Sequence, residues 1–364
     1  MVDLHAWLRL AAVPTLGGHR ITRLLQHSTP QDLTRMTAVE LAQTGLTPAQ
    51  IQHYLHPPVT KIAHSLKWAE QPGQTLLTLD SPDYPLLLKE IASPPPLLFV
   101  RGETRWLHEP QLAVIGSRSA SLDGREAAYE FAAALVAADY VVTSGLALGI
   151  DGQAHYGALK NGGATVAVLG SGLDRIYPAK HRDLAAAIAE QGALVSEFWP
   201  DEAPRPQNFP RRNRVISGLS VGVLVVEAAQ KSGSLVTARY ALEQGREVFA
   251  LPGPIRYAGS RGCHALIKNG AKLVETPADI FEEVGALTEC VKNNHSNRRG
   301  EEPENEELPF PALLATVGSE ATPVDVVAER SGLPVHEVMM QLLEFELQGW
   351  VTSVPGGYIR TRRG

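Results

Sequence analysis

The sequence predicts an α/β protein with a Rossmann-like parallel sheet core, preceded by a small helical domain and followed by a winged helix. Three observations lead to this fold class. Short, nearly continuous apolar segments alternate with helix-like segments through the middle of the chain, which is typical of parallel strands covered by helices on both faces. Apolar residues recur at helical spacing before this region, and helical segments followed by a hairpin come after it.

Residues 1–75 are expected to form short helices broken by glycine and proline. Apolar side chains at helical spacing, such as Leu4, Trp7 and Leu8, precede turns at residues 14–18 and 44–48. Helix pairs joined by a glycine turn occur in SAM-like and helix-hairpin-helix modules, whose backbone N–H groups can hold phosphate. A helical domain that serves only for packing is the alternative.

Residues 76–287 are expected to carry the parallel sheet. Strands are predicted over residues 112–116, 140–144, 164–169, 193–196, 221–226 and 247–251. Helices are predicted over residues 123–138, 149–160 and 234–244. This alternation requires helices on both faces of the sheet, because each apolar strand must be buried on both sides.

The last part of the chain divides into a linker and a compact unit. Residues 288–309 combine low hydrophobicity with clustered charge, which predicts a flexible linker. In residues 310–364, helices are expected over 311–317, 323–330 and 334–348, with a hairpin over 351–359. The sharp turn at residues 331–334 and the following hairpin are typical of a winged helix.

Composition limits the class of protein. The 364 residues carry a net charge of −6, which argues against a uniformly basic surface but allows a local basic groove. The two cysteines, Cys263 and Cys290, have no metal-binding spacing, so no metal, cofactor or disulfide is expected. The first residues lack a cleavable apolar segment, and no apolar run is long enough to cross a bilayer. A cytoplasmic protein without membrane contact is therefore expected.

Three glycine-containing loops follow strands at the edge where parallel sheets bind their ligands. The first adds an arginine and a serine to exposed backbone N–H groups, which suits phosphate. In all three, glycine lets the backbone approach a ligand closely. The candidate residues are Gly116, Ser117 and Arg118 in the first loop, Ser144 and Gly145 in the second, and Gly170 and Gly172 in the third, with Lys180 shortly after.

A fourth segment, residues 205–214, holds four arginines and no acid around one aromatic ring. Basic side chains can follow the phosphates of single-stranded nucleic acid while a base stacks on the ring. In the alternative interpretation, some arginines pair with acids at the sheet edge and the ring fills the core. The candidate residues are Arg205, Phe209, Arg211, Arg212, Asn213 and Arg214.

These segments, in this order, resemble the signature motifs of the DprA (Smf) family. Further matching motifs are Glu227-Ala228, Ser232-Gly233-Ser234-Leu235-x-Thr237-Ala238 and Leu251-Pro252-Gly253. The resemblance implies a homodimer, not an enzyme, that binds single-stranded DNA and works with the RecA recombinase. It further implies that the protein protects or delivers incoming DNA in natural transformation, and it maps Arg118 and the glycine loops onto the family's DNA-binding pocket.

Three other functions compete with this interpretation. A nucleotide-processing Rossmann hydrolase of the lysine-decarboxylase-like type is the main alternative, but residues 231–238 lack the acid that such a site needs. Asp151, Asp174 and Glu227 are single carboxylates without a second catalytic group at a suitable spacing. An NAD(P) oxidoreductase lacks its GxGxxG fingerprint here. The winged helix alone suggests a transcription regulator.

The third helix of the predicted winged helix is acidic, with Glu337, Glu344 and Glu346 and no lysine or arginine over residues 334–349. Such a helix would be repelled by phosphates, and its apolar residues suit packing better than base recognition. The nearby basic residues are Arg360, Arg362 and Arg363. We therefore expect a domain that contacts protein or regulates, rather than one that reads a DNA sequence.

Overall fold

The computed structural model describes residues 3–299, 313, 316–318, 322–347, 351–354 and 357–360. The chain divides into two compact units, Met1–His295 and Ser296–Gly364. The larger unit joins a helical lobe to a mixed α/β domain with a mostly parallel sheet, and the described residues of the smaller unit include helices and a hairpin. The predicted fold class is confirmed.

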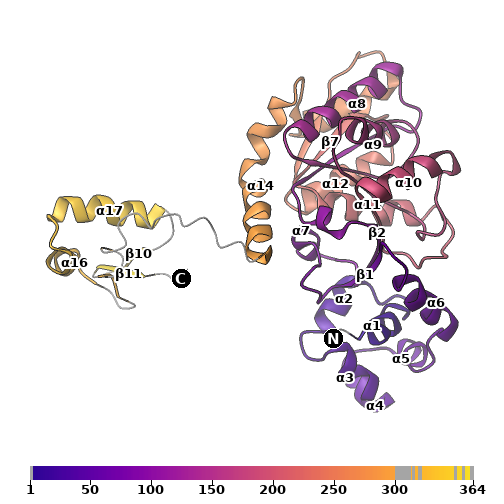
Figure 1. Ribbon diagram of the computed structural model, residues 1–364, viewed down its shortest axis with the longest axis horizontal. Helices are drawn as coiled ribbons and strands as arrows, with labels where there is room; N and C mark the ends of the chain where they lie inside the picture. The colour runs from indigo at the N-terminus through magenta and orange to yellow at the C-terminus, as the bar shows by residue number, and fades with distance from the viewer. Residues whose placement is uncertain are drawn as a thin grey trace. The chain divides into compact units, whose positions relative to one another are not determined.

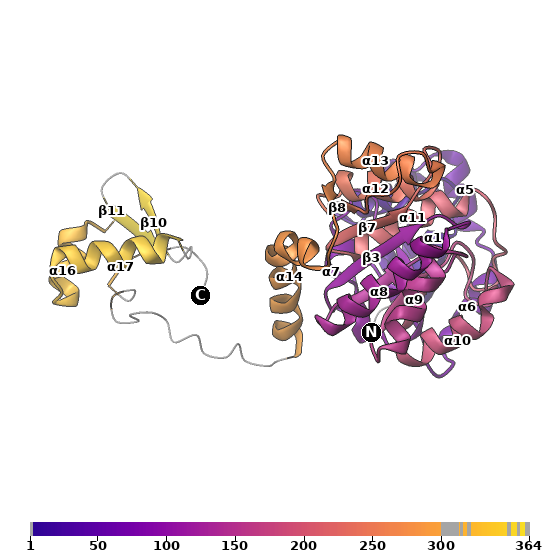
Figure 2. The same ribbon diagram turned by 90° about the horizontal axis from the view of Figure 1, so that it is seen from above.

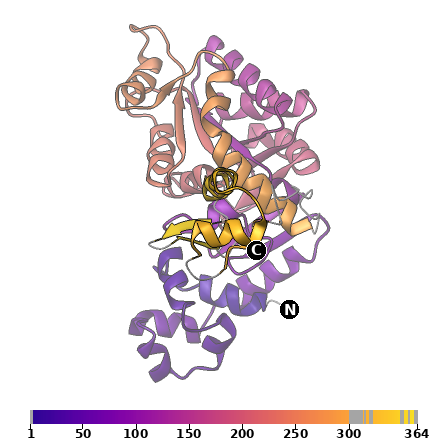
Figure 3. The ribbon, with the colours of Figure 1, turned by 90° about the vertical axis from the view of Figure 1, so that its left-hand side faces the viewer.

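The N-terminal lobe consists of six short helices at one end of the larger unit (Figures 1 and 3). They are α1 (Leu4–Ala11), α2 (Gly18–Leu24), α3 (Pro30–Arg35), α4 (Ala38–Gln43), α5 (Pro48–Leu55) and α6 (Val59–Ala69). Helices α3, α4 and α5 each begin at a threonine, Thr29, Thr37 or Thr47, that forms a capping box. These caps stabilise helices that are too short to persist without tertiary packing.

The sheet has nine strands in the order β1-β2-β6-β5-β4-β3-β7-β8-β9. They are β1 (Gln74–Thr78), β2 (Leu97–Gly102), β3 (Gln111–Gly116), β4 (Val141–Ser144), β5 (Thr165–Val168), β6 (Ala193–Ser196), β7 (Gly222–Glu227), β8 (Glu247–Ala250) and β9 (Lys272–Leu273). In this spatial order, each neighbouring pair from β6 through β3 to β9 is parallel. Strand β2 pairs antiparallel with both β1 and β6. The six strands expected from the sequence are all present, and β1, β2 and β9 extend the sheet at its two ends.

Helices cover both faces of this sheet, and Figure 2 shows α8 and α9 on the side of β3 opposite α12 and α13. The helices of this domain are α7 (Leu86–Lys89), α8 (Leu122–Ala137), α9 (Ile150–Lys160), α10 (Arg182–Gln191), α11 (Asn208–Leu219), α12 (Ser234–Glu243), α13 (Arg261–Lys268) and α14 (Ala278–Arg299), with 3₁₀ turns at Thr104–Leu107, Ala179–His181 and Ala258–Ser260. Along β3, Leu112 and Val114 belong to the core under α8 and α9, whereas Ala113 and Ile115 belong to the core under α11 and α12. This alternation follows from the period of two along a strand.

The order of strands reverses beside β3. From β3 the chain adds β4, β5 and β6 on one side, then returns to β7 and adds β8 and β9 on the other. The loops that follow β3 and β7 therefore leave the sheet in opposite directions and open a crevice at its carboxyl edge. Ligands of open α/β sheets bind at such a point.

Helix α14 continues to Arg299, well beyond the linker boundary at residue 288 that composition predicts. The reason is packing, because Thr288 and Val291 are buried and the hydroxyls of Tyr140 and Thr288 lie 3.0 Å apart. Tyr140 also stacks on Phe281, so the helix stays attached to the domain past residue 288. Residues 300–309 of the predicted linker lie outside the described residues.

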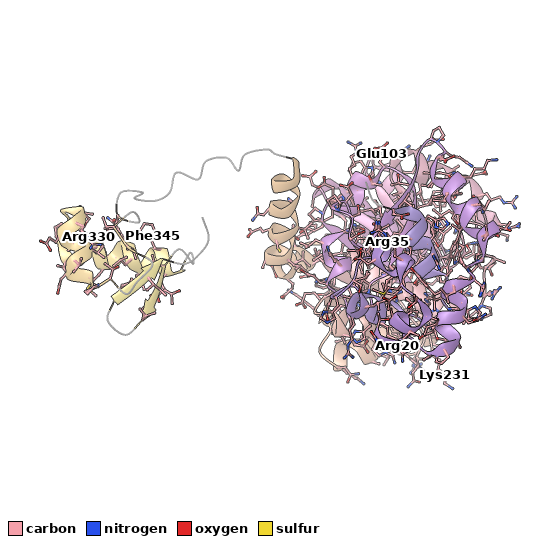
Figure 4. All side chains as sticks on the ribbon, turned by 90° about the horizontal axis from the view of Figure 1, so that it is seen from below. Arg20, Arg35, Glu103, Lys231, Arg330 and Phe345 are labelled. Atoms are coloured by element: carbon pink, nitrogen blue, oxygen red, sulfur yellow. The ribbon has the colours of Figure 1, made fainter. Side chains whose placement is uncertain are left out.

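The smaller unit contains α16 (Val324–Ser331), α17 (Val335–Leu347), β10 (Val351–Val354) and β11 (Gly357–Arg360). Its core includes Val327, Leu342 and Phe345, the last labelled in Figure 4. Met339, Met340 and Leu343 of the same helix are each more than half exposed, because they lie on the face of α17 turned away from this core. Of the helix predicted over 311–317, only residues 313 and 316–317 are described. Within the described ranges, no helix is long and apolar enough to span a membrane.

Candidate nucleic-acid interface

A cavity of about 740 Å³ opens at the carboxyl edge where β3 and β7 diverge. It brings together the loop after β3, the start of α11 and the segment between β7 and α12. The residues that line it are Ile115, Gly116, Ser117, Arg118, Ser119, Ala147, Asp151, Tyr177, Pro206, Phe209, Pro210, Arg212, Asn213, Ile216, Ala229, Lys231, Ser232, Gly233, Ser234 and Thr237.

One wall of the cavity is formed by Arg118, Tyr177 and Phe209. The guanidinium carbon of exposed Arg118 lies 5.2 Å from the centre of the Phe209 ring, and the ring of Tyr177 lies 5.7 Å from it. Gly170 permits this position of Phe209, because a Cβ there would lie 2.8 Å from the ring. The wall therefore combines an exposed cation with two partly exposed rings.

The floor of the cavity is formed by Arg212 and Asp151, which are almost fully buried. Arg212, only 4% exposed, donates from Nη1 to the carbonyl oxygen of Gly145 at 2.6 Å and also to that of Val168. Asp151 accepts from the backbone N–H of Gly145 at 3.2 Å. Burial lowers the pKa of Arg212 to about 10 and raises the pKa of Asp151. The opposite charge of the other side chain partly opposes each shift, because it favours the ionised form. A buried cation held by carbonyls and a nearby carboxylate is a structural part of the site.

His155 lies one helical turn after Asp151 and is fully buried. Its Nδ1 is 2.7 Å from the hydroxyl of Thr165, which itself donates to the carbonyl oxygen of Val142. Nδ1 must therefore carry the proton, and Nε2 is buried without a hydrogen-bond partner among the residues that the structure describes. Burial lowers the pKa of His155 to about 3, so the ring is neutral at physiological pH.

Another part of the cavity lining comes from residues 229–237. Exposed Lys231 projects at the margin of the larger unit (Figure 4), and Ser232, Ser234 and Thr237 add hydroxyl groups. Asn213 on α11 reaches across and donates to the carbonyl oxygen of Gly233 at 3.2 Å. Exposed cations, hydroxyl groups and partly exposed rings around one cavity suit a ligand with phosphates and flat bases.

Comparison with known proteins agrees with this geometry. A family model described as DNA recombination-mediator protein A matches residues 75–285, and models of the SMF/DprA SAM domain and the DprA winged helix domain match residues 1–67 and 299–357. The chain belongs to the DprA/Smf family. The predicted resemblance is confirmed.

Three relatives illustrate the similarity. Protein Smf of Escherichia coli strain K12 is 52% identical over 100% of this chain and 97% of its own length. The X-ray structure of DprA from Streptococcus pneumoniae has a TM-score of 0.69 and 35% identity, covering 78% of this chain and 98% of that one. A DprA structure from Helicobacter pylori, described as revealing a unique single-stranded DNA binding mode, has a TM-score of 0.52 and 28% identity, covering 59% of this chain and 96% of that one.

The structure places the candidate residues from the sequence at different distances from the cavity. Those that line the cavity are Gly116, Ser117, Arg118, Phe209, Arg212 and Asn213. Gly145 and Gly170 lie directly behind it, since a Cβ at either position would meet Arg212 or Phe209. The sequence thus located the cavity, although it did not separate Arg118 on the wall from Arg212 in the floor.

Four candidates lie outside the cavity lining and have contacts elsewhere in the protein. The buried hydroxyl of Ser144 donates to the carbonyl oxygen of Val114, and Gly172 packs against the backbone of Trp199 and Pro200. Arg211 and Arg214 both pair with Glu197, at 3.0 and 2.6 Å. These two arginines confirm the alternative interpretation that some of the cluster neutralises a sheet-edge acid.

Lys180 and Arg205 are exposed but lie outside the cavity lining, on the turn Ala179–His181 and just before α11. Tyr177, Lys231, Ser234 and Thr237 line the cavity and were not predicted as site residues. The family motif over residues 232–238 was the signal that could have found the last two. Among the described residues, no group of three or more His, Cys, Asp or Glu is placed to hold a metal ion.

Proposed function

We propose that this chain binds single-stranded DNA in the cavity between β3 and β7. The observation that carries the proposal is the wall, where the Arg118 cation and the Phe209 and Tyr177 rings meet at one edge. Arg118 and Lys231 attract phosphates, and a ring that is partly exposed offers a base a face to stack on. The single-stranded DNA binding described for the Helicobacter pylori relative supports the proposal.

We further propose that the protein protects incoming DNA and helps load RecA recombinase during natural transformation or DNA processing, acting as a cytoplasmic homodimer and not as an enzyme. Membership in a family described as recombination mediators supports this role. Light scattering of the purified protein tests the dimer. RecA-dependent strand exchange with and without the protein tests loading, and an unchanged rate would contradict it.

Fluorescence anisotropy with single- and double-stranded oligonucleotides tests DNA binding directly. If about three to five cations replace counterions, the log–log salt slope on single strands is about −2 to −4, at about −0.7 per phosphate. Arg118→Ala removes a charge-assisted contact worth about 1.5–3 kcal/mol, so affinity falls about ten- to a hundredfold.

Arg239→Ala is the matched control, because Arg239 is an exposed arginine paired with Glu243 on α12, outside the cavity lining. A flat salt titration, or equal affinities of the Arg118 variant and the control, would contradict the proposal. Nucleotide release measured in the same samples tests the hydrolase alternative, for which a product that accumulates with time is the expected sign.

A further inference from the structure

The loop that follows β8 leaves the sheet at the same carboxyl edge as the cavity, because β8 is parallel to β7. It carries Ile255, which is 82% exposed, Tyr257, which is 39% exposed, and the exposed Arg256. An arginine beside exposed apolar and aromatic side chains repeats the composition of the cavity wall. None of these three residues lines the cavity itself.

A buried carboxylate ties this loop to the loop that carries Arg118. Glu227 accepts from the hydroxyl of Tyr257 through Oε1 at 2.8 Å and from the hydroxyl of Ser121 through Oε2 at 2.7 Å. Oε2 also accepts from the backbone N–H of Ser121 at 3.1 Å, and the Glu227 carbonyl oxygen accepts from the N–H of Ser117 at 2.7 Å. The Arg118 loop and the Tyr257 loop are therefore held by one residue.

The Tyr257 ring is fixed in place while part of it stays open. Its hydroxyl is held by Glu227, and Gly259 lies so close to the ring that a Cβ there would clash with it. The hydrogen bond to Glu227 raises the pKa of Tyr257, so the phenol keeps the proton that it donates. A ring with a fixed orientation loses little conformational entropy when a flat group stacks on it.

The loop lies next to the cavity along the carboxyl edge of the sheet. Ser119 lines the cavity, and Ser121, two residues further on, is bonded to the carboxylate that holds Tyr257. Two residues span at most about 7 Å, so the cavity and the Tyr257 loop are neighbours along this edge. Arg256 is exposed on this loop, and an exposed arginine attracts phosphates.

We propose that Tyr257 is a second stacking platform for single-stranded DNA outside the cavity, with Arg256 beside it and Glu227 as the positioning residue of both loops. This inference rests on the proposed function, because it assumes that the cavity holds part of the same strand. It assigns a role to nucleotides beyond those in the cavity, and it predicts that affinity depends on oligonucleotide length.

The test compares oligothymidylates of about 4 and 16 nucleotides, the range of site sizes of single-strand binding folds. Tyr257→Ala lowers affinity for the long oligonucleotide about five- to tenfold and leaves the short one unchanged. Tyr257→Phe keeps the ring and stays within about threefold of the wild type on both. Arg256→Ala reduces the salt slope on the long oligonucleotide by about 0.7, one phosphate contact.

Tyr156→Ala is the matched control, since Tyr156 is 37% exposed on α9 and lies outside the cavity lining. Equal affinity of Tyr257→Ala and the control for the long oligonucleotide overturns the inference. Equal losses on both lengths also overturn it, because Tyr257 would then act only on the cavity through Glu227. A changed oligomeric state of Tyr257→Ala in light scattering overturns it as well and makes the loop a contact between chains. If the wild type binds neither length, the proposed function itself has failed.

Discussion

Arg118 and Arg212 line the same cavity, yet the structure uses them in opposite ways. Arg118 is exposed and rests over a ring, whereas Arg212 is buried and donates to two main-chain carbonyl oxygens. A free guanidinium can exchange its water for phosphate at little cost, but Arg212 would first have to abandon its bonds to the protein. The comparison shows that an arginine in a binding site contacts the ligand only if its donors are still available.

The largest expected effect is a loss of folding stability when Arg212 in the floor of the cavity is substituted. Arg212→Met leaves two buried carbonyl oxygens without this donor and Asp151 without its opposite charge. Loss of one partner from such a buried arrangement lowers the free energy of unfolding by about 3–5 kcal/mol. Urea denaturation of the variant and the wild type measures this difference. Arg118→Ala is the control and should change it by less than about 0.5 kcal/mol. A stable Arg212→Met protein that has lost only DNA affinity would refute the distinction between floor and wall.

The sequence predicted much of the sheet because its central strands are continuous apolar runs between glycine turns. Strands β1, β2 and β9 were not predicted. For β9 the reason is its length, since it spans only Lys272–Leu273 and carries no periodic signal. The start of α11 was not predicted, because Pro206 and Pro210 suggest a loop. Proline is nevertheless tolerated in the first turn of a helix.

That helix explains the mixed outcome in the arginine cluster. Residues 209–214 turn around α11, so Phe209, Arg212 and Asn213 reach the cavity while Arg211 and Arg214 reach Glu197. Composition identified the cluster, but the direction of each side chain depends on the helical period and on where the helix begins. An expectation based on charge alone could not separate these roles.

The buried His155 makes the stability of the fold depend on pH. His155, one turn from Asp151, is neutral when folded because its pKa is about 3, but it titrates at about 6.5 when unfolded. The unfolded state binds more protons below pH 6.5, so this contribution is fully present above that pH and is lost as pH falls toward 3. Between pH 8 and pH 5 the loss is about 2 kcal/mol, at 1.36 kcal/mol per pH unit.

Urea denaturation of the wild type and of His155→Gln at both pH values measures this term. The variant should be less stable at pH 8, yet its stability should fall by about 2 kcal/mol less on going to pH 5. Equal falls in the two proteins would mean that His155 is protonated in the folded state, in conflict with its buried Nε2.

On the wall, removal of the Phe209 ring should reduce affinity without loss of the fold. Stacking of one base is worth about 1–3 kcal/mol, so Phe209→Ala weakens binding about five- to a hundredfold for all base sequences alike. Phe209→Tyr keeps the ring and should have a mild effect. Anisotropy titrations give the affinities, and thermal melting shows whether the fold is intact. If Phe209→Ala unfolds the domain and Phe209→Leu restores binding, the ring is part of the core and the wall has no stacking platform.

The smallest expected effect concerns the second unit, whose surface differs from the cavity in charge and polarity. Helix α17 presents exposed Met339, Met340 and Leu343 and carries the acidic Glu337 and Glu346 without any lysine or arginine. Flexible apolar side chains beside carboxylates suit contact with another protein. The carboxylates would be repelled by a phosphate backbone, and the apolar side chains would gain nothing from it. Deletion of residues 300–364 should therefore leave single-strand affinity within about threefold, or about 0.65 kcal/mol. Anisotropy of the truncated and full-length proteins at one salt concentration measures the ratio. A loss of tenfold or more, or sequence-specific duplex binding by the isolated unit, would show that the winged helix reads DNA and that the charge of α17 does not decide its role.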